Sequence, residues 1–427
     1  MKMKNRMIAQ GVSLDELPNS NQNQLIVGSS GSGKTGSFLT SCLMAANGES
    51  IVVSDCKQNL YRKFLGHLVC DGYQVYNLNL VDPDQGCGYD PLDYIRCEYK
   101  NGKRVWNQKD ILTISSVLCP LDPNEREPFW TQQAQMVISI LIAYVLTEMN
   151  GKERNLASIL DVFRAMCDTA DSGEVPFLSD YCVKYPDSFA ARRYQMISGC
   201  FKADKTWASI KFFVANALSI FEFDAAREML SKRSSFSLHD LGRKPTVCFV
   251  NVSDTDRSLD PIANCFYTQI MNILCSDADR EPDSKLAVPV RLILDDFASN
   301  VYIPFFDKFI SVVRSRNISI TCMIQALSQL NSYYGVAKAN TIINNCSTLY
   351  FLGGQDLDTV GYLSQRANIP PEDIMCLPNE MGILLRSGEK PLKVRKIKPY
   401  SMMKELEEEQ VEFDDDQPEP AVTDSAV

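Results

Sequence analysis

The segment from Gly28 to Thr35 constrains this chain most, because it spells G-x-x-x-x-G-K-T directly after the apolar run Leu25 to Val27. Its glycines let the backbone curl until successive N–H groups point at a polyphosphate, and the dipole of a following helix also favours an anion. Lys34 is expected to reach the β- and γ-phosphates and Thr35 to bind Mg²⁺. The apolar run predicts a strand and residues 37–46 predict a helix, which is the context this motif needs. A glycine- and serine-rich linker is the alternative reading.

A phosphate loop also needs a carboxylate at the end of a buried strand to help hold Mg²⁺. The segment Arg291 to Phe297 supplies Asp295 and Asp296 after an apolar run. We expect Asp295 to face the metal and Asp296 to polarise the attacking water, where many hydrolytic P-loop enzymes keep a glutamate. Because Asp is about one methylene shorter than Glu, we expect turnover to be slow. A surface Asp-Asp turn after a core strand is the alternative.

Three further side chains are candidates for catalysis. Gln325 follows a predicted strand that ends at Ile324, which would place its amide beside the phosphates at the carboxyl edge of a parallel sheet. Arg314 and Arg316 precede that strand and are candidates for an arginine finger in a neighbouring subunit's site. The alternatives are a buried or capping glutamine, and arginines that are solvated or pair with a helix end.

The predicted site can therefore be stated residue by residue, with ATP and Mg²⁺ as its cofactors. The predicted catalytic residues are Lys34, Asp295, Asp296, Gln325, Arg314 and Arg316. The predicted nucleotide-binding residues are Gly28, Ser29, Ser30, Gly31, Ser32, Gly33, Lys34, Thr35 and Gly36. The predicted metal ligands are Thr35 and Asp295.

Strand-like and helical patterns alternate at both ends of the chain. Strands are predicted at 49–55, 73–78, 246–252, 292–294, 318–324 and 349–352, and a hairpin at 382–394. Between Tyr94 and Lys232 the periodicity is mostly helical, with almost no β-rich run. These patterns predict an α/β fold with a mostly parallel sheet, split by an all-α insertion. The predicted division is 1–95 and 236–400 for the nucleotide-binding domain, 96–235 for the insertion and 401–427 for a tail.

The net charge of −10 is concentrated at the end of the chain. Residues 404–427 carry ten carboxylates and one lysine, which leaves 42 basic and 43 acidic residues elsewhere. A global basic field for nucleic acid is therefore absent, and we expect DNA contacts from local patches or from a pore made by oligomerisation. The acidic tail predicts disorder and a lure for a basic protein, and a solubility tail without a partner is the alternative.

Two other segments bear on partners and location. A basic and aromatic stretch from Arg192 and Arg193 through Trp207 to Lys211 is a candidate DNA contact, with a solvated helix face and a core Trp207 as the alternative. The longest apolar segment, 136–146, is shorter than the roughly 20 residues that a membrane-spanning helix requires. We therefore expect a cytoplasmic protein.

The order of these motifs resembles that of the VirD4/TraG coupling proteins, the DNA-pumping ATPases of conjugation. Residues 47–62 are similar to the family segment "ngSyvvtDPKGELyr" and residues 89–95 to "yNPfdYI". Residues 294–354 follow the family's order of acidic pair, Arg-Ser-Arg, glutamine and Phe-Leu-Gly-Gly. The resemblance covers most of residues 24–400 and implies a RecA-like domain with an all-α insertion and a hexameric ring. The implied partners are single-stranded DNA, relaxase and relaxosome proteins, and the ATPases and membrane components of the secretion channel.

Three departures from the family pattern bear on function. Only 27 residues precede Gly28, whereas the family usually has membrane-spanning helices there, so we expect recruitment to the inner face of the membrane. The segment "DPKGEL" has become Asp55-Cys56-Lys57-Gln58-Asn59-Leu60, and the acidic pair Asp-Glu has become Asp295-Asp296. Two other functions stay open, a substrate-docking adaptor that binds ATP and hydrolyses it slowly, and a soluble FtsK/HerA-type DNA translocase. DNA-stimulated hydrolysis separates the pump from the adaptor.

Overall fold

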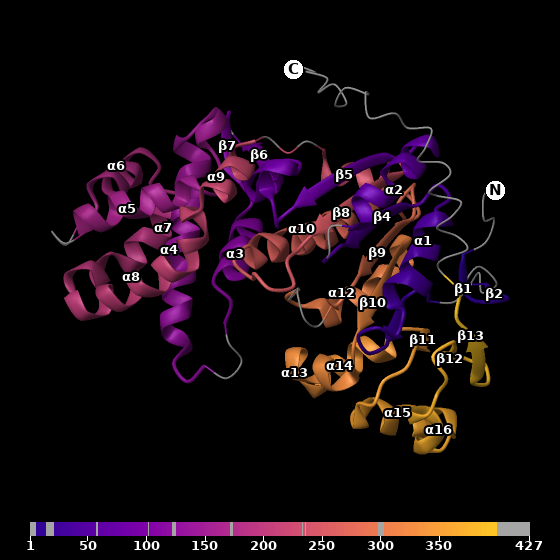
Figure 1. Ribbon diagram of the computed structural model, residues 1–427. Coiled ribbons are helices and arrows are strands. Elements are labelled where there is room, and N and C mark those ends of the chain that lie inside the picture. The colour runs from indigo at the N-terminus through magenta and orange to yellow at the C-terminus, as the bar shows by residue number, and fades with distance from the viewer. Residues whose placement is uncertain are drawn as a thin grey trace.

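The central element of the fold is a nine-stranded sheet in the order β13-β12-β11-β3-β10-β9-β4-β8-β5 (Figure 1). The computed structural model describes residues 6–13, 21–56, 59–100, 102–121, 125–170, 174–232, 234, 236–297 and 303–398, so the predicted tail lies outside the described residues. The strands are β3 (Gln24–Val27), β4 (Ser50–Ser54), β5 (Gln74–Asn79), β8 (Thr246–Asn251), β9 (Val290–Leu294), β10 (Ile318–Ile324), β11 (Thr348–Phe351), β12 (Met381–Arg386) and β13 (Leu392–Arg395).

Seven of these strands, from β11 to β5 in the sheet order, run parallel to one another. The hairpin of β12 and β13 adds two antiparallel strands at one edge. The predicted mostly parallel α/β fold is therefore confirmed. Because the carboxyl ends of parallel strands meet at one edge of the sheet, the residues that follow β3, β9 and β10 come together there.

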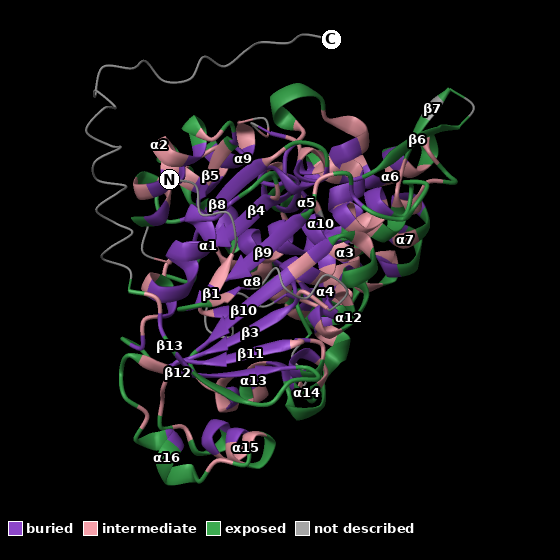
Figure 2. Cartoon of the chain, turned by 90° about the vertical axis from the view of Figure 1, so that its right-hand side faces the viewer, coloured by how far each residue is buried: buried purple, intermediate pink, exposed green. Residues whose placement is uncertain are grey.

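From β11 to β8 in the sheet order both faces of the sheet are buried, which explains why these strands read as nearly continuous apolar runs (Figure 2). In β3, Ile26 packs into one core with Phe38 and Phe64, whereas Leu25 and Val27 belong to the core on the opposite face. The first core is covered by η1 (Lys34–Leu39), α1 (Thr40–Met44) and α2 (Asn59–Cys70). The second is covered by α3 (Gln108–Leu118), α10 (Asp260–Ala278), α12 (Phe306–Val312) and α14 (Val336–Asn344).

The segment between β5 and β8 contains most of the remaining helices, which gather beside the sheet (Figure 1). They are α4 (Pro128–Glu148), α5 (Ser158–Ala170), α6 (Pro176–Lys184), α7 (Phe189–Ile197), α8 (Asp204–Leu218) and α9 (Asp224–Ser231). Helix α4 packs against α3, α5, α7 and α8. By length and composition α4 could cross a membrane, but 61% of its apolar window is buried inside the fold, as in the core helix of a globular protein. The exact domain boundaries stay predictions.

One strand prediction for this segment was wrong. Strands β6 (Cys97–Lys100) and β7 (Lys103–Trp106) form an antiparallel hairpin where almost no β-structure was expected. Every residue of β6 is exposed, so the strand has no buried face and shows no alternation of apolar and polar residues. The other short elements are β1 (Met7–Ala9), β2 (Val12–Ser13), α13 (Leu327–Tyr334), α15 (Leu357–Ala367) and α16 (Pro371–Met375).

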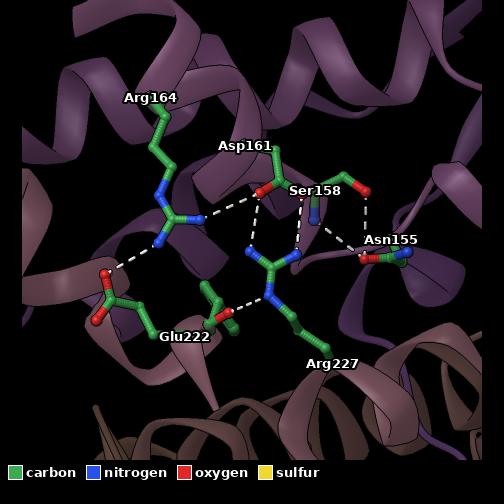
Figure 3. Close-up of polar contacts among 7 residues, drawn as sticks. Asn155, Ser158, Asp161, Arg164, Glu222 and Arg227 are labelled. Atoms are coloured by element: carbon green, nitrogen blue, oxygen red, sulfur yellow. Dashed lines mark hydrogen bonds and ion pairs between the residues drawn. The ribbon is translucent and has the colours of Figure 1, made fainter. Parts of the chain in front are cut away.

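A network of ion pairs links α5 to the segment around α9 (Figure 3). Arg227 forms a two-pronged contact with Asp161 at 2.8 and 3.0 Å, and its Nε donates to the Phe221 carbonyl at 2.6 Å. Arg164 lies 3.6 Å from Asp161 and donates to Glu222 at 3.1 Å. The Arg227 guanidinium holds the pKa of Asp161 below its usual value. The network lies on a solvated side of the insertion and joins α5 to residues 221–227.

Candidate nucleotide-binding site

The phosphate loop lies between β3 and η1 and is anchored to the ends of two neighbouring strands. The Gly28 N–H donates to the Ile324 carbonyl at 3.0 Å, and the Ser29 N–H donates to the Gly353 carbonyl at 2.9 Å. A side chain at Gly28 would place its Cβ 3.0 Å from the Leu352 Cβ, and Gly33 has a φ of +93° that favours glycine. The helix after the loop begins at Lys34 rather than at residue 37 as predicted, and its first turn is π-helical.

The lysine and threonine of the loop each face one residue of the acidic pair. The buried Lys34 ammonium donates to the Gly28 carbonyl at 2.6 Å and lies 3.8 Å from Asp296 Oδ1. The Thr35 hydroxyl donates to Asp295 Oδ2 at 3.1 Å. The fold therefore brings the pair Lys34 and Thr35 to the acidic pair Asp295 and Asp296, about 260 residues later in the sequence.

Asp295 is buried at the end of β9, and its main chain is fixed by the neighbouring strand. Its N–H donates to the Ser54 hydroxyl oxygen at 2.5 Å, and the Ser54 hydroxyl lies 3.1 Å from its carbonyl. Burial raises the pKa of Asp295 to about 6, and repulsion from Asp296 adds to this effect. The hydrogen bond from Thr35 and the charge of Lys34 act in the opposite direction. A buried carboxyl beside a hydroxyl oxygen is a donor set that suits Mg²⁺, whose charge would favour the ionised form.

Asp296 occupies a turn that aims its carboxylate at the same site. Its φ of +48° is left-handed, a conformation that Asp tolerates better than most residues. Asp296 Oδ1 accepts a hydrogen bond from Gln325 Nε2 at 3.3 Å. The structure therefore brings Gln325 to the acidic pair, at the carboxyl edge where the sequence placed it. A role for Gln325 in sensing the γ-phosphate stays a prediction.

Comparison with known proteins agrees with this geometry. The family model for conjugative DNA transfer by the type IV secretory system matches residues 3–368. This chain belongs to that family. Protein VirD4 of Rhizobium radiobacter is 26% identical over 224 residues, which cover 45% of this chain and 32% of the relative. The coupling protein VirD4 of Bartonella henselae is 19% identical over 344 residues, which cover 78% of this chain and 52% of the relative. The chain thus spans about a third to a half of the length of these relatives.

Solved structures of the conjugative coupling protein TrwB share the fold of this chain. The coupling protein TrwBdeltaN70 in complex with sulphate aligns with a TM-score of 0.67 and 18% identity, covering 93% of this chain and 90% of that one. TrwB in complex with ADP and Mg²⁺ aligns with a TM-score of 0.66 and 17% identity over the same shares. The predicted resemblance to VirD4/TraG coupling proteins is confirmed.

Arg314 and Arg316, the two candidate finger arginines, directly precede β10 and so lie at the amino ends of the parallel strands. The phosphate loop lies at the carboxyl ends of these strands. Arg316 donates to both carboxylate oxygens of Asp279, at 2.9 and 3.2 Å. Arg314 lines a groove of about 750 Å³ together with Arg6, Glu49 and Lys285. Within one chain the fold does not bring either arginine to Lys34. A finger role would require the site of a neighbouring chain, and it stays a prediction.

Part of the basic and aromatic stretch of the insertion is packed into the fold, and a DNA contact by this stretch stays a prediction. Arg193 donates to the Ser139 hydroxyl at 3.0 Å and lies over the Phe189 ring at 4.9 Å. Trp207 is buried and packs edge-on against Phe201. The alternative reading of Trp207 as a core residue is therefore correct. Lys202 and Lys205 are the lysines of this stretch that stay exposed.

The contacts of two polar side chains in the site region were missed by reasoning from sequence. Asp55 accepts the Leu60 N–H at 2.7 Å and so caps α2, whereas Lys57 and Gln58 lie outside the described residues. Lys396 donates to the carbonyls of Ser32 and Leu352. The sequence holds a weak signal that Lys396 is buried. It lies two positions after the apolar Val394 and therefore on the same side of an extended chain.

Proposed function

We propose that this chain is an ATPase that couples DNA transfer to type IV secretion. It binds ATP with Mg²⁺ at residues 28–36, recruits relaxase-bound single-stranded DNA, and uses hydrolysis to drive delivery of that DNA to the conjugation channel. The observation that carries the proposal is the pairing of Lys34 with Asp296 and of Thr35 with Asp295. TrwB in complex with ADPNP, and in complex with ADP and Mg²⁺, supports the same ligands for this chain.

Each residue of the site has a distinct role in this proposal. Lys34 would bind the β- and γ-phosphates, and Thr35 and Asp295 would hold Mg²⁺, which when bound neutralises charge on the phosphate oxygens. Asp296 Oδ1 faces Gln325 and Lys34, so Oδ2 is the oxygen that would accept a hydrogen bond from the attacking water. Gln325 keeps the Asp296 carboxylate in that orientation. Because the Asp side chain is short, the proposed turnover is slow.

The proposed assembly extends beyond one chain. We infer that the active state is a homohexamer at the inner face of the membrane, in contact with relaxosome proteins and with the ATPases and membrane components of the channel. In such a ring, Arg314 or Arg316 would act in the site of the next subunit. The adaptor function is the second candidate, since the Asp296 geometry favours slow hydrolysis.

Hydrolysis by the purified chain tests this proposal. We expect wild-type ATPase activity that rises when single-stranded DNA is added, and we expect Lys34→Ala to abolish it because the phosphate charge is left uncompensated. Lys338→Ala removes an exposed lysine of α14 and serves as the matched control. Unaltered activity in Lys34→Ala would show that this loop is not the catalytic site. ATP binding without DNA-stimulated hydrolysis in the wild type would favour the adaptor.

A further inference from the structure

A buried lysine behind the phosphate loop joins two segments that are far apart in the sequence. Lys396 directly follows β13, and its side chain is only 7% exposed. Its ammonium donates to the Ser32 carbonyl at 2.8 Å and to the Leu352 carbonyl at 2.5 Å. Its own N–H donates to the Glu380 carbonyl at 2.8 Å, which fixes its backbone beside β12. One cation therefore ties the edge hairpin of the sheet to the phosphate loop and to the end of β11.

Burying the Lys396 ammonium costs free energy, and its hydrogen bonds to two carbonyls offset that cost. Burial lowers the pKa of Lys396, while the carboxylate of Glu380 acts in the opposite direction. A buried ammonium is costly unless it is hydrogen-bonded, and bonds from a charged donor are roughly twice as strong as neutral ones. Two carbonyl acceptors at short distances supply that compensation.

Peptide geometry explains what the contact does to the phosphate loop. In a trans peptide the C=O and the N–H point in opposite directions. The ammonium that holds the Ser32 carbonyl therefore directs the Gly33 N–H away from Lys396. On the neighbouring segment, the Leu352 carbonyl is held by the same ammonium, and the Gly353 carbonyl accepts the Ser29 N–H at 2.9 Å. Both ends of the loop are thus oriented by the segments around Lys396.

We propose that Lys396 is a positioning residue for the phosphates of the bound nucleotide, acting by fixing the Ser32–Gly33 peptide so that the Gly33 N–H faces the ligand. The inference rests on the proposed nucleotide site. The partners of Lys396 are backbone carbonyls, whereas the acidic pair is contacted by Lys34, Thr35 and Gln325. Lys396 is therefore expected to affect nucleotide affinity and KM more than kcat.

Titration calorimetry with ADP and Mg²⁺, together with steady-state ATPase kinetics, tests the inference on the full chain. Lys396→Met keeps the apolar stem and removes the donor, so we expect affinity to fall and KM to rise about tenfold, with kcat within about twofold of the wild type. Lys396→Arg restores a charged donor and should recover part of the affinity. Lys393→Met removes an exposed lysine of β13, and we expect it to bind like the wild type.

The outcomes separate this inference from the proposed function. A wild type that binds no nucleotide would refute both. Nucleotide binding by the wild type with equal affinity in Lys396→Met, or an equal loss in Lys393→Met, would refute the positioning role alone. A fall in kcat at unchanged KM would also refute it. Should Lys396→Met fail to fold by circular dichroism, Lys396→Gln, which is uncharged and one bond shorter and so loses the charged donor, is measured by the same criteria.

Discussion

Replacing Asp295 by Asn is expected to stabilise the nucleotide-free protein while destroying its metal site. Burial and the charge of Asp296 raise the pKa of Asp295 from its usual 3.8 to about 6 in the folded protein. Between about pH 4 and pH 6 the folded state therefore binds this proton more tightly than the unfolded chain, and stability falls as pH rises through that window. This difference in pKa between the folded and unfolded states corresponds to about 3 kcal/mol of unfolding free energy. Above pH 6 the ionised carboxylate costs the fold up to this amount, and Asn removes the cost.

Urea unfolding of the two proteins at several pH values, without nucleotide or Mg²⁺, measures this effect. The stability difference between Asp295→Asn and the wild type should be near zero below pH 4 and should grow to as much as about 3 kcal/mol at pH 8. Asp180→Asn changes an exposed carboxyl of α6 and is the matched control, with no growing difference expected. ADP with Mg²⁺ should stabilise the wild type but not the variant. An Asp295→Asn protein that is less stable than the wild type at pH 8 would refute the reasoning.

Three further predictions concern other parts of the chain. Asp296→Asn should lower ATP hydrolysis at least tenfold, on the order of 1.4 kcal/mol of barrier, with nucleotide affinity preserved; equal rates in single-turnover assays would assign water activation to another group. Asp161→Asn should cost less than about 1 kcal/mol at pH 7 because the pair with Arg227 is half-exposed. Since Arg227 lowers the pKa of Asp161, this cost should shrink as pH falls below the ordinary pKa of Asp and disappear as pH falls through the lowered pKa of the folded state; urea titrations at pH 7 and pH 3 check that the cost is smaller at pH 3. Deleting residues 405–427 should leave ATP binding intact and weaken capture of a basic relaxase most at low salt, whereas equal pull-down by both proteins in low salt would rule out the lure.

Local patterns in the sequence predicted the strands of the sheet and the phosphate loop because their determinants are local. Buried parallel strands are runs of apolar residues such as Leu25 to Val27, and a loop that binds phosphate needs its glycines at fixed spacing. The meeting of Asp295 with Thr35 was also predictable, since parallel strands bring their carboxyl ends to one edge.

Contacts that depend on tertiary packing were not predictable in the same way. Lys396 contacts the Ser32 carbonyl only because the edge hairpin folds back against the phosphate loop, and no motif encodes that arrangement. The hairpin of β6 and β7 was missed because an exposed strand has no apolar face. The contacts of Arg193 with Ser139 of α4 and with the Phe189 ring could not be read from the sequence, because a charged residue is usually solvated.

The strand order of the sheet has a consequence for how this chain folds during synthesis. In the described sheet, β3 pairs with β10 and β11, β4 with β8 and β9, and β5 with β8, so no two of the first three large strands are neighbours. None of these three strands can pair in this sheet until β8, which begins at Thr246, has left the ribosome. The helices between residues 108 and 231 pack mainly on one another, so they can form before β8 is made. The emerging chain therefore holds unpaired apolar strands for much of its synthesis, the interval in which chaperones would matter most.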